Sequence, residues 1–229
     1  MNSIRLHIRG QMGVQILQAA TAISTINEEE EPILCVNTGG NLTYDGTNKL
    51  NNIFDVKCRV IEIDDTIRKT PYWIEGAATY IFKNRAKVIK WLVPKTFSKK
   101  LDLGRAVHIR GLDKNVASME SYDHLVGVAT YESDNVTIYS DDPERTKKYS
   151  TCRISNQTSL EDWIDIYHSE IVYAAPSAFI MSMLILDPNK HVVFLGDKYC
   201  NGTYGAYQND MLFIREAQEY CPNMVILDD

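Results

Sequence analysis

Several features that would place a chain in a common functional class are missing from this sequence. There is no CxxC pair and no signal-peptide apolar region at the N-terminus, and the longest uncharged run, 171–186, is interrupted by Pro176. That run is shorter than the ~20 apolar residues that a membrane-spanning helix requires. An odd number of scattered cysteines fits a reducing compartment better than a disulfide framework or a zinc site. We therefore expect a cytoplasmic protein with no membrane span.

An excess of positive charge is also missing. The formal net charge is −6, which argues against binding of nucleic acid through a broad basic surface, although a local basic cleft for a phosphorylated ligand is compatible with it. A chain of 229 residues with 45% hydrophobic and 24% charged residues has the composition of an ordinary globular protein. Its length accommodates one large domain or two small ones.

The N-terminal segment lacks the GxGxxG pattern of dinucleotide-binding folds. Residues 4–8 alternate like a strand, Gly10 and Gly13 follow, and 14–23 have the pattern of an amphipathic helix. Strand, glycine turn and helix form the first half of a βαβ unit. The glycines indicate either a tight turn with close helix packing or backbone amides that face a substrate.

Further strands and helices alternate along the chain, with parallel sheets expected in both halves. We read 37–52 as an irregular loop and 72–92 as one helix that ends before Pro94. The lysines that follow it mark an exposed connection, which separates domain 1–100 from domain 101–229. Strands are predicted at 33–36, 57–63, 107–110, 135–139, 151–154, 171–174, 191–195 and 224–227, and further helices at 122–131, 159–167 and 210–220. The segment 176–179 is predicted to turn into an apolar helix that runs through Leu186.

The most informative stretch is 106–113, where a short apolar strand leads into His108, Arg110 and Asp113 on the loop at its end. Ligands of open α/β sheets bind at the carboxyl ends of the strands. An arginine there offers a rigid fork of donors that matches phosphate oxygens. The alternative is a surface arginine beside a helix-capping aspartate.

Two other strand ends carry polar groups. Asp142 precedes Pro143 and is expected to cap a helix, with proline in the first helical position. Capping explains one aspartate, and the adjacent pair with Asp141 could also accept hydrogen bonds from a base or a ribose. After Pro176, small residues open an apolar helix, whose free amides would stabilise an anion.

Four segments together resemble the fucosyltransferases that form α-1,2 and α-1,6 linkages, with the bacterial α-1,2 enzymes the most similar. Residues 108–113 (HIRGLD) resemble the HxRRxD motif, and 10–20 (GQMGVQILQAA) resemble the N-terminal GGLGNQMFQYA signature. Residues 140–143 (SDDP) match a strand that ends in (S/T)DDP, and 175–179 (APSAF) resemble NSSFSWW. The chain departs from these motifs at Val14, Gly111, Met181 and Ser182.

The resemblance implies a GT-B-like α/β fold, in which two Rossmann-type parallel-sheet domains face a central cleft. Domain 1–100 would be the acceptor side and domain 101–229 would bind the nucleotide sugar. The implied reaction is inverting transfer of fucose from GDP-fucose to a glycan hydroxyl, without a metal and without a cofactor other than the donor substrate.

The resemblance also assigns residues to roles. Catalytic roles fall to Arg110, His108 and Asp113, and acceptor-side roles to His7, Gly10, Gly13 and Gln15. Candidates for the general base are His7, Asp113 and Asp45, and Lys114 or Arg105 could replace the second motif arginine, which is Gly111. The residues expected to contact the nucleotide sugar are Arg110, Ser140, Asp141, Asp142, Ser177, Ala178 and Phe179.

Three functions stay open at this point. The first is a fucosyltransferase-like enzyme. The second is a glycosyltransferase of the same fold with a different nucleotide sugar or acceptor, including a modified nucleobase. The third is a non-catalytic protein that binds sugar nucleotides. Gly111, and Met181 and Ser182 in place of the motif tryptophans, favour the second and third functions. Retention of Arg110, of the aspartate pair and of Ser177 favours an enzyme.

Overall fold

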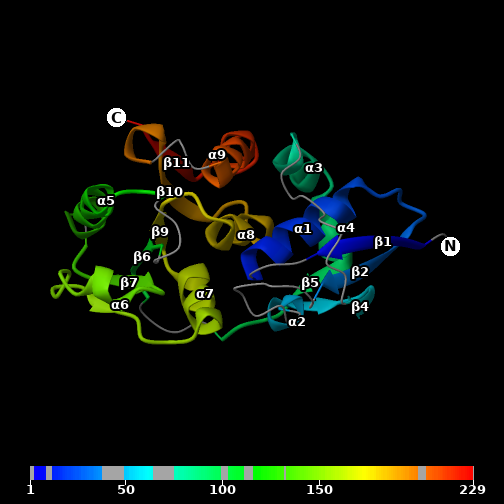
Figure 1. The fold of residues 1–229 in the computed structure, drawn as a ribbon, viewed down its shortest axis with the longest axis horizontal. Helices are drawn as coiled ribbons and strands as arrows, with labels where there is room; N and C mark the ends of the chain where they lie inside the picture. The colour runs from blue at the N-terminus through cyan, green and yellow to red at the C-terminus, as the bar shows by residue number, and fades with distance from the viewer. Residues whose placement is uncertain are drawn as a thin grey trace. The chain divides into compact units, whose positions relative to one another are not determined.

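In the computed structural model the described residues are 3–8, 12–37, 49–63, 75–98, 103–110, 116–131, 133–200 and 205–228. The chain forms two units (Figure 1). The first comprises Met1–Thr96 with Ala178–Asp187, and the second comprises Phe97–Ser177 with Pro188–Asp229. The chain first passes from one unit to the other after Thr96, near the predicted boundary at residue 100. The later segment Ala178–Asp187 also belongs to the first unit, which was not predicted. No helix in the described ranges is long and apolar enough to cross a membrane.

The first unit is built on a parallel sheet. Its strands β1 (Ser3–Ile8), β2 (Glu31–Asn37) and β4 (Arg59–Ile63) lie in the order β1-β2-β4, as the sequence predicts for a βαβ start. Helix α1 (Met12–Thr25) connects β1 to β2. A second, antiparallel sheet of β3 (Phe54–Val56) and β5 (Leu92–Pro94) was not predicted, because two three-residue strands carry too little periodicity to be recognised.

Two predictions for the helices of this unit are wrong. The described part of 72–92 forms two helices, α3 (Ala77–Lys83) and α4 (Arg85–Trp91), instead of one. Asn84 separates them with backbone angles outside the helical range (φ −107°, ψ 22°), and its side-chain amide donates to the carbonyl of Tyr80. The loop predicted over 37–52 contains the start of a short helix, α2 (Leu50–Ile53), while 38–48 lie outside the described residues.

Helix α8 (Ala178–Leu186) has the predicted position but belongs to the first unit, where it packs against α1 (Figure 1). Apart from Phe179, every residue of α8 is buried, which explains a sequence that is apolar on all sides. Arg85 holds the other end of α8, where Nε and Nη2 donate to the carbonyls of Ile185 and Leu186. These bonds satisfy carbonyls that have no partner within a helix.

The second unit contains a six-stranded sheet in which every pair is parallel. The strand order is β11-β10-β9-β6-β7-β8. Residues 136–139 are all buried, as expected for a strand that is covered on both faces. The strands are β6 (Arg105–Ile109), β7 (Val136–Ser140), β8 (Arg153–Ile154), β9 (Ile171–Ala174), β10 (His191–Leu195) and β11 (Met224–Leu227).

Helices connect these strands at positions close to those predicted. Helix α7 (Ser159–His168) begins with a capping box, in which the side chains of Thr158 and Glu161 each accept the backbone N–H of the other residue. The remaining helical segments of the unit are α5 (Met119–Tyr131), α6 (Pro143–Thr146), α7 (Ser159–His168), the 3₁₀ turn η1 (Asp197–Tyr199) and α9 (Gly205–Ala217).

Candidate active site

The strand order of the second unit points to a candidate ligand site. The chain starts in the middle of the sheet with β6, runs outward through β7 and β8, and then returns to the other side of β6 with β9, β10 and β11. This is the doubly wound order in which ligands bind where the direction of winding reverses, at the carboxyl ends of the two central strands. Here those strands are β6 and β9, which end at Ile109 and Ala174.

Arg110 spans this switch point. It directly follows β6, as predicted, and its Nη1 donates to the carbonyl oxygen of Pro176, behind β9, at 3.2 Å. The same nitrogen lies 3.7 Å from a carboxylate oxygen of Asp210 in α9. Both contacts use Nη1, and no contact with another described residue is made through Nε or Nη2. Because a guanidinium carries five N–H donors, the side chain retains capacity for a ligand.

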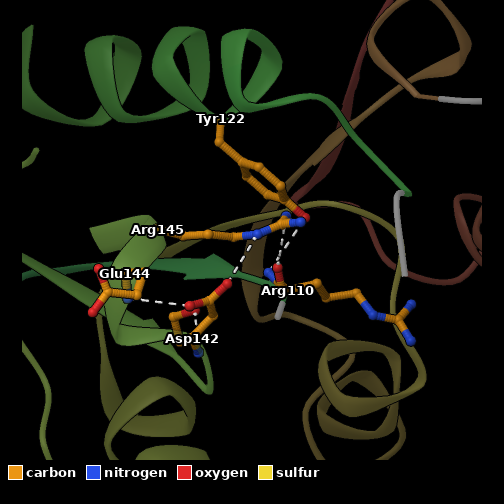
Figure 2. A network of polar contacts seen from close by, with 6 residues as sticks. Arg110, Tyr122, Asp142, Glu144 and Arg145 are labelled. Carbon is orange, nitrogen blue, oxygen red and sulfur yellow. Dashed lines mark hydrogen bonds and ion pairs between the residues drawn. The ribbon is translucent and has the colours of Figure 1, made fainter. Parts of the chain in front are cut away.

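The backbone of Arg110 is held by two other side chains (Figure 2). Its N–H donates to the hydroxyl oxygen of Tyr122 at 3.3 Å, and its carbonyl accepts from Nη1 of Arg145 at 3.3 Å. Tyr122 is fully buried, and burial raises the pKa of its hydroxyl to about 12, so the group is neutral over the physiological range. Both contacts lie at the backbone end of Arg110, and in this view its side chain points away from them.

The two adjacent aspartates differ in their surroundings. Asp142 is the predicted N-cap of α6: it is buried, and Oδ1 accepts the N–H of Glu144 at 3.1 Å. Its Oδ2 lies 3.2 Å from Nε of Arg145, so both carboxylate oxygens serve the protein. The hydroxyl of Ser140 also accepts the N–H of Asp142. The side chain of Asp141, in contrast, is exposed. Asp141 is therefore the member of the pair that is accessible to a base or a ribose.

His108 lies inside β6, in agreement with the predicted strand 107–110, and not on the loop at the end of the strand, where the site prediction placed it. Its backbone pairs with Tyr139 and Ala174 of the neighbouring strands. Burial lowers the pKa of the imidazole to about 3, and the positive charge of Arg110 acts in the same direction. His108 is therefore neutral at pH 7 and offers no charge to an anion, whereas Arg110 does.

The three residues predicted after β9 fall on the border between the units. Ser177 is buried and ends a segment of the second unit, whereas Ala178 and Phe179 begin α8 in the first. A Cβ atom at Gly13 would lie 2.5 Å from the carbonyl oxygen of Ala178. Gly13 thus allows the first turns of α1 and α8 to touch, and supports the close-packing interpretation of this glycine.

The other predicted residues lie elsewhere. Gln15 is buried in α1, where its Oε1 accepts the backbone N–H of Lys49 at 2.9 Å. His7 lies on β1 with its backbone opposite Cys35. Arg105 begins β6, at the edge of the sheet opposite Arg110, so it is not a substitute for the second motif arginine. Gly10, Asp45, Gly111, Asp113 and Lys114 lie outside the described residues.

Three residues around Arg110 were missed by the sequence reading: Tyr122, Arg145 and Asp210. Arg145 could have been found, because an arginine three residues after an N-cap aspartate shares its helix face. Tyr122 and Asp210 reach Arg110 through tertiary contacts from α5 and α9, for which the sequence carries no local signal. Among the described residues there is no group of three or more His, Cys, Asp or Glu side chains that could hold a metal ion.

Comparison with known proteins supports the fold. No protein-family profile and no curated protein sequence matches the chain. Two solved structures of E. coli heptosyltransferase WaaC do match, one with ADP and one with ADP-2-deoxy-2-fluoro heptose. Their TM-scores are 0.53 and 0.52, each at 11% sequence identity, and each match covers 99% of this chain and 92% of that chain. The fold is GT-B-like. Its α/β class and its two Rossmann-type units, predicted from the sequence, are confirmed.

Proposed function

We propose that the protein is an inverting glycosyltransferase that takes its sugar from a nucleotide diphosphate donor. The observation that carries the proposal is the position of Arg110, whose guanidinium spans the switch point between β6 and β9. A cation at this place can bind the diphosphate of a nucleotide sugar, while the exposed Asp141 can accept hydrogen bonds from the base or the ribose.

In the proposed reaction an acceptor hydroxyl attacks the anomeric carbon of the donor sugar. The bond from that carbon to the diphosphate oxygen breaks, its electron pair stays on the departing nucleoside diphosphate, and the hydroxyl proton leaves to a base or to water. Negative charge grows on the diphosphate during this step. Arg110 is positioned to stabilise it, and a fixed donor at such a place is typically worth ~2.7–4 kcal/mol of the barrier.

We propose GDP-fucose as the donor and a glycan hydroxyl as the acceptor, because the SDDP stretch and the HIRGLD stretch resemble those of fucosyltransferases. A second candidate is an ADP-activated sugar. It is favoured by the likeness, along nearly the whole chain, to a heptosyltransferase that was solved with ADP ligands. In both cases the nucleotide would be bound by the second unit.

A thermal-shift screen of nucleotide sugars tests the proposal. A ligand at about 100 times its Kd stabilises the folded protein by ~2.7 kcal/mol, which raises the melting temperature measurably. We expect GDP-fucose and GDP to give the largest shifts. A preference for ADP ligands would favour the second candidate, and a preference for UDP or CMP ligands would contradict both base assignments. If no nucleotide shifts the melting temperature, the proposed function is wrong.

Release of the nucleoside diphosphate then distinguishes an enzyme from a protein that only binds the donor. With a glycan acceptor present, an enzyme converts the stabilising donor to the free diphosphate in many turnovers. A non-catalytic binder retains the donor intact, and that result would favour the third function considered above.

A further inference from the structure

The backbone N–H and carbonyl of Arg110 are both held by side chains that belong to neither β6 nor β9. Tyr122 comes from α5 and accepts the N–H, while Arg145 comes from α6 and donates to the carbonyl oxygen. Because Arg110 directly follows β6, the strand itself orders only the N-terminal side of this residue. These two contacts set the direction in which the Arg110 side chain leaves the backbone.

Arg145 is itself held in place. Its Nε lies 3.2 Å from Oδ2 of Asp142, and the exposed fraction of the Arg145 side chain is 17%. Asp142 is buried and bonded through Oδ1 to the start of α6, so the anchor of the arginine is itself held by the protein. The guanidinium fork therefore connects the end of β7 to the end of β6 by two directional contacts, with separate nitrogens for each.

We propose that Arg145 is a positioning residue: it fixes the carbonyl of Arg110 and thereby directs the guanidinium of Arg110 toward the diphosphate of the ligand. This inference rests on the proposed function, in which Arg110 contacts the diphosphate. In this proposal Arg145 acts through Arg110: its Nε and Nη1 are engaged by Asp142 and by the carbonyl oxygen of Arg110, at the backbone end of Arg110, and the Arg110 side chain points away from them (Figure 2).

A double-mutant cycle on the full chain separates these roles. The four proteins are wild type, Arg110→Ala, Arg145→Met and the double variant, each titrated with GDP and, in parallel, with ADP. If Arg145 acts through Arg110, Arg145→Met weakens nucleotide binding by about 10-fold in the wild-type background. In the Arg110→Ala background it then causes little further loss, because there is no side chain left to direct.

Two variants control for charge and for folding. Lys147→Met removes a positive charge from the residue that follows α6, where Lys147 is exposed and pairs with Glu144, and it should leave binding unchanged. Arg145→Lys keeps the charge next to Asp142 but loses the planar fork, so it should rescue binding only in part. If Arg145→Met does not fold, Arg145→Lys replaces it in the cycle, and affinities are compared per folded molecule.

The outcomes separate this inference from the function on which it rests. If Arg110→Ala weakens binding but Arg145→Met does not, or if the two losses add fully, the positioning role is wrong and the proposed function stands. Full rescue by Arg145→Lys would also overturn the positioning role, since a point charge would then suffice. If Arg110→Ala leaves nucleotide binding unchanged, or if neither GDP nor ADP binds the wild type, the proposed function fails and the inference fails with it.

Discussion

At the scale of the residue, Arg110 combines a fixed backbone with a side chain that reaches across to the neighbouring strand end. The contacts to Tyr122 and Arg145 hold the peptide, and those to Pro176 and Asp210 hold the guanidinium. A donor that is already oriented before the ligand binds needs no reorganisation when charge develops, which is the condition for effective electrostatic catalysis.

Replacement of Arg110 gives the most direct prediction at this scale. Arg110→Ala should weaken binding of the donor nucleotide and reduce transfer by roughly 100-fold or more, because it removes a charge-assisted contact that strengthens in the transition state. Arg110→Lys should recover part of the loss. The check is affinity and melting temperature on the same preparation. A destabilised Arg110→Ala protein with unchanged affinity per folded molecule would mean that Arg110 is a structural partner of Asp210.

His108 predicts a pH dependence of stability. Its pKa is about 3 in the folded protein and near its ordinary 6.5 in the unfolded chain, so below pH 6.5 the unfolded chain binds a proton that the folded protein does not. Stability should therefore fall as the pH decreases from 6.5, by at most ~1.4 kcal/mol per pH unit from this group, and be unaffected by it above 6.5.

The measurement compares wild type with His108→Gln in urea denaturation between pH 7.5 and pH 5. Since other groups titrate equally in both proteins, the difference between the two free energies of unfolding isolates His108. That difference should shift in favour of the variant as the pH falls. If it is constant over this range, the imidazole is not kept neutral by its surroundings.

At the scale of the element, α8 is the segment whose role the sequence least reveals. Its apolar composition predicts a buried helix correctly, and its position after β9 predicts membership of the second unit. Contacts instead place it beside α1 in the first unit, with Arg85 holding its last carbonyls. The chain therefore leaves the second unit after Ser177 and returns to it at Pro188.

Gly13 tests the packing of these two helices. Gly13→Ala would place a Cβ within 2.6 Å of backbone atoms of Ala178 and Phe179, which cannot rotate away as a side chain could. We expect a loss of stability of ~1–3 kcal/mol from overpacking. The midpoint of urea denaturation measures it.

A matched glycine provides the control. Gly127 lies in α5, and a Cβ there would meet nothing within 4 Å. Gly127→Ala should be neutral or stabilise the protein by up to ~1 kcal/mol, because alanine favours helix and restricts the unfolded chain. If the two substitutions change the free energy of unfolding equally, close packing of α1 against α8 does not require glycine at residue 13.

At the scale of the whole molecule, the doubly wound sheet of the second unit selects the site. The ends of β6, β7 and β9, which are distant in sequence, lie at its carboxyl edge, because parallel strands in one sheet end at the same edge. Arg110, after β6, donates to the carbonyl oxygen of Pro176, after β9, and Asp142, after β7, anchors Arg145.

We predict that donor binding and transfer do not require a divalent metal, because the proposed site neutralises the diphosphate with an arginine. A preparation treated with EDTA and dialysed should bind GDP or ADP with the same Kd and turn over at the same rate as one supplied with Mg²⁺ or Mn²⁺. The thermal-shift screen compares nucleotide binding in the two preparations, and release of the nucleoside diphosphate compares their turnover. Loss of activity on chelation that is restored by Mn²⁺ would contradict this prediction.

The sequence by itself determined the order of most strands and helices, the α/β class, the cap formed by Asp142, and the strand end that carries Arg110. These depend on periodicity and on contacts between near neighbours, which short stretches encode. The break at Asn84 and the small antiparallel sheet escaped it, because their local signals are weak.

Only the tertiary structure decided what surrounds Arg110 and where α8 belongs. Tyr122 and Asp210 reach Arg110 from helices that lie 12 and 100 residues further along the chain, and the Arg110–Pro176 bond spans 66 residues. Such contacts follow from the order in which parallel strands pair. That order depends on which strands of the whole unit pair when the sheet is buried on both faces, and no local pattern records it.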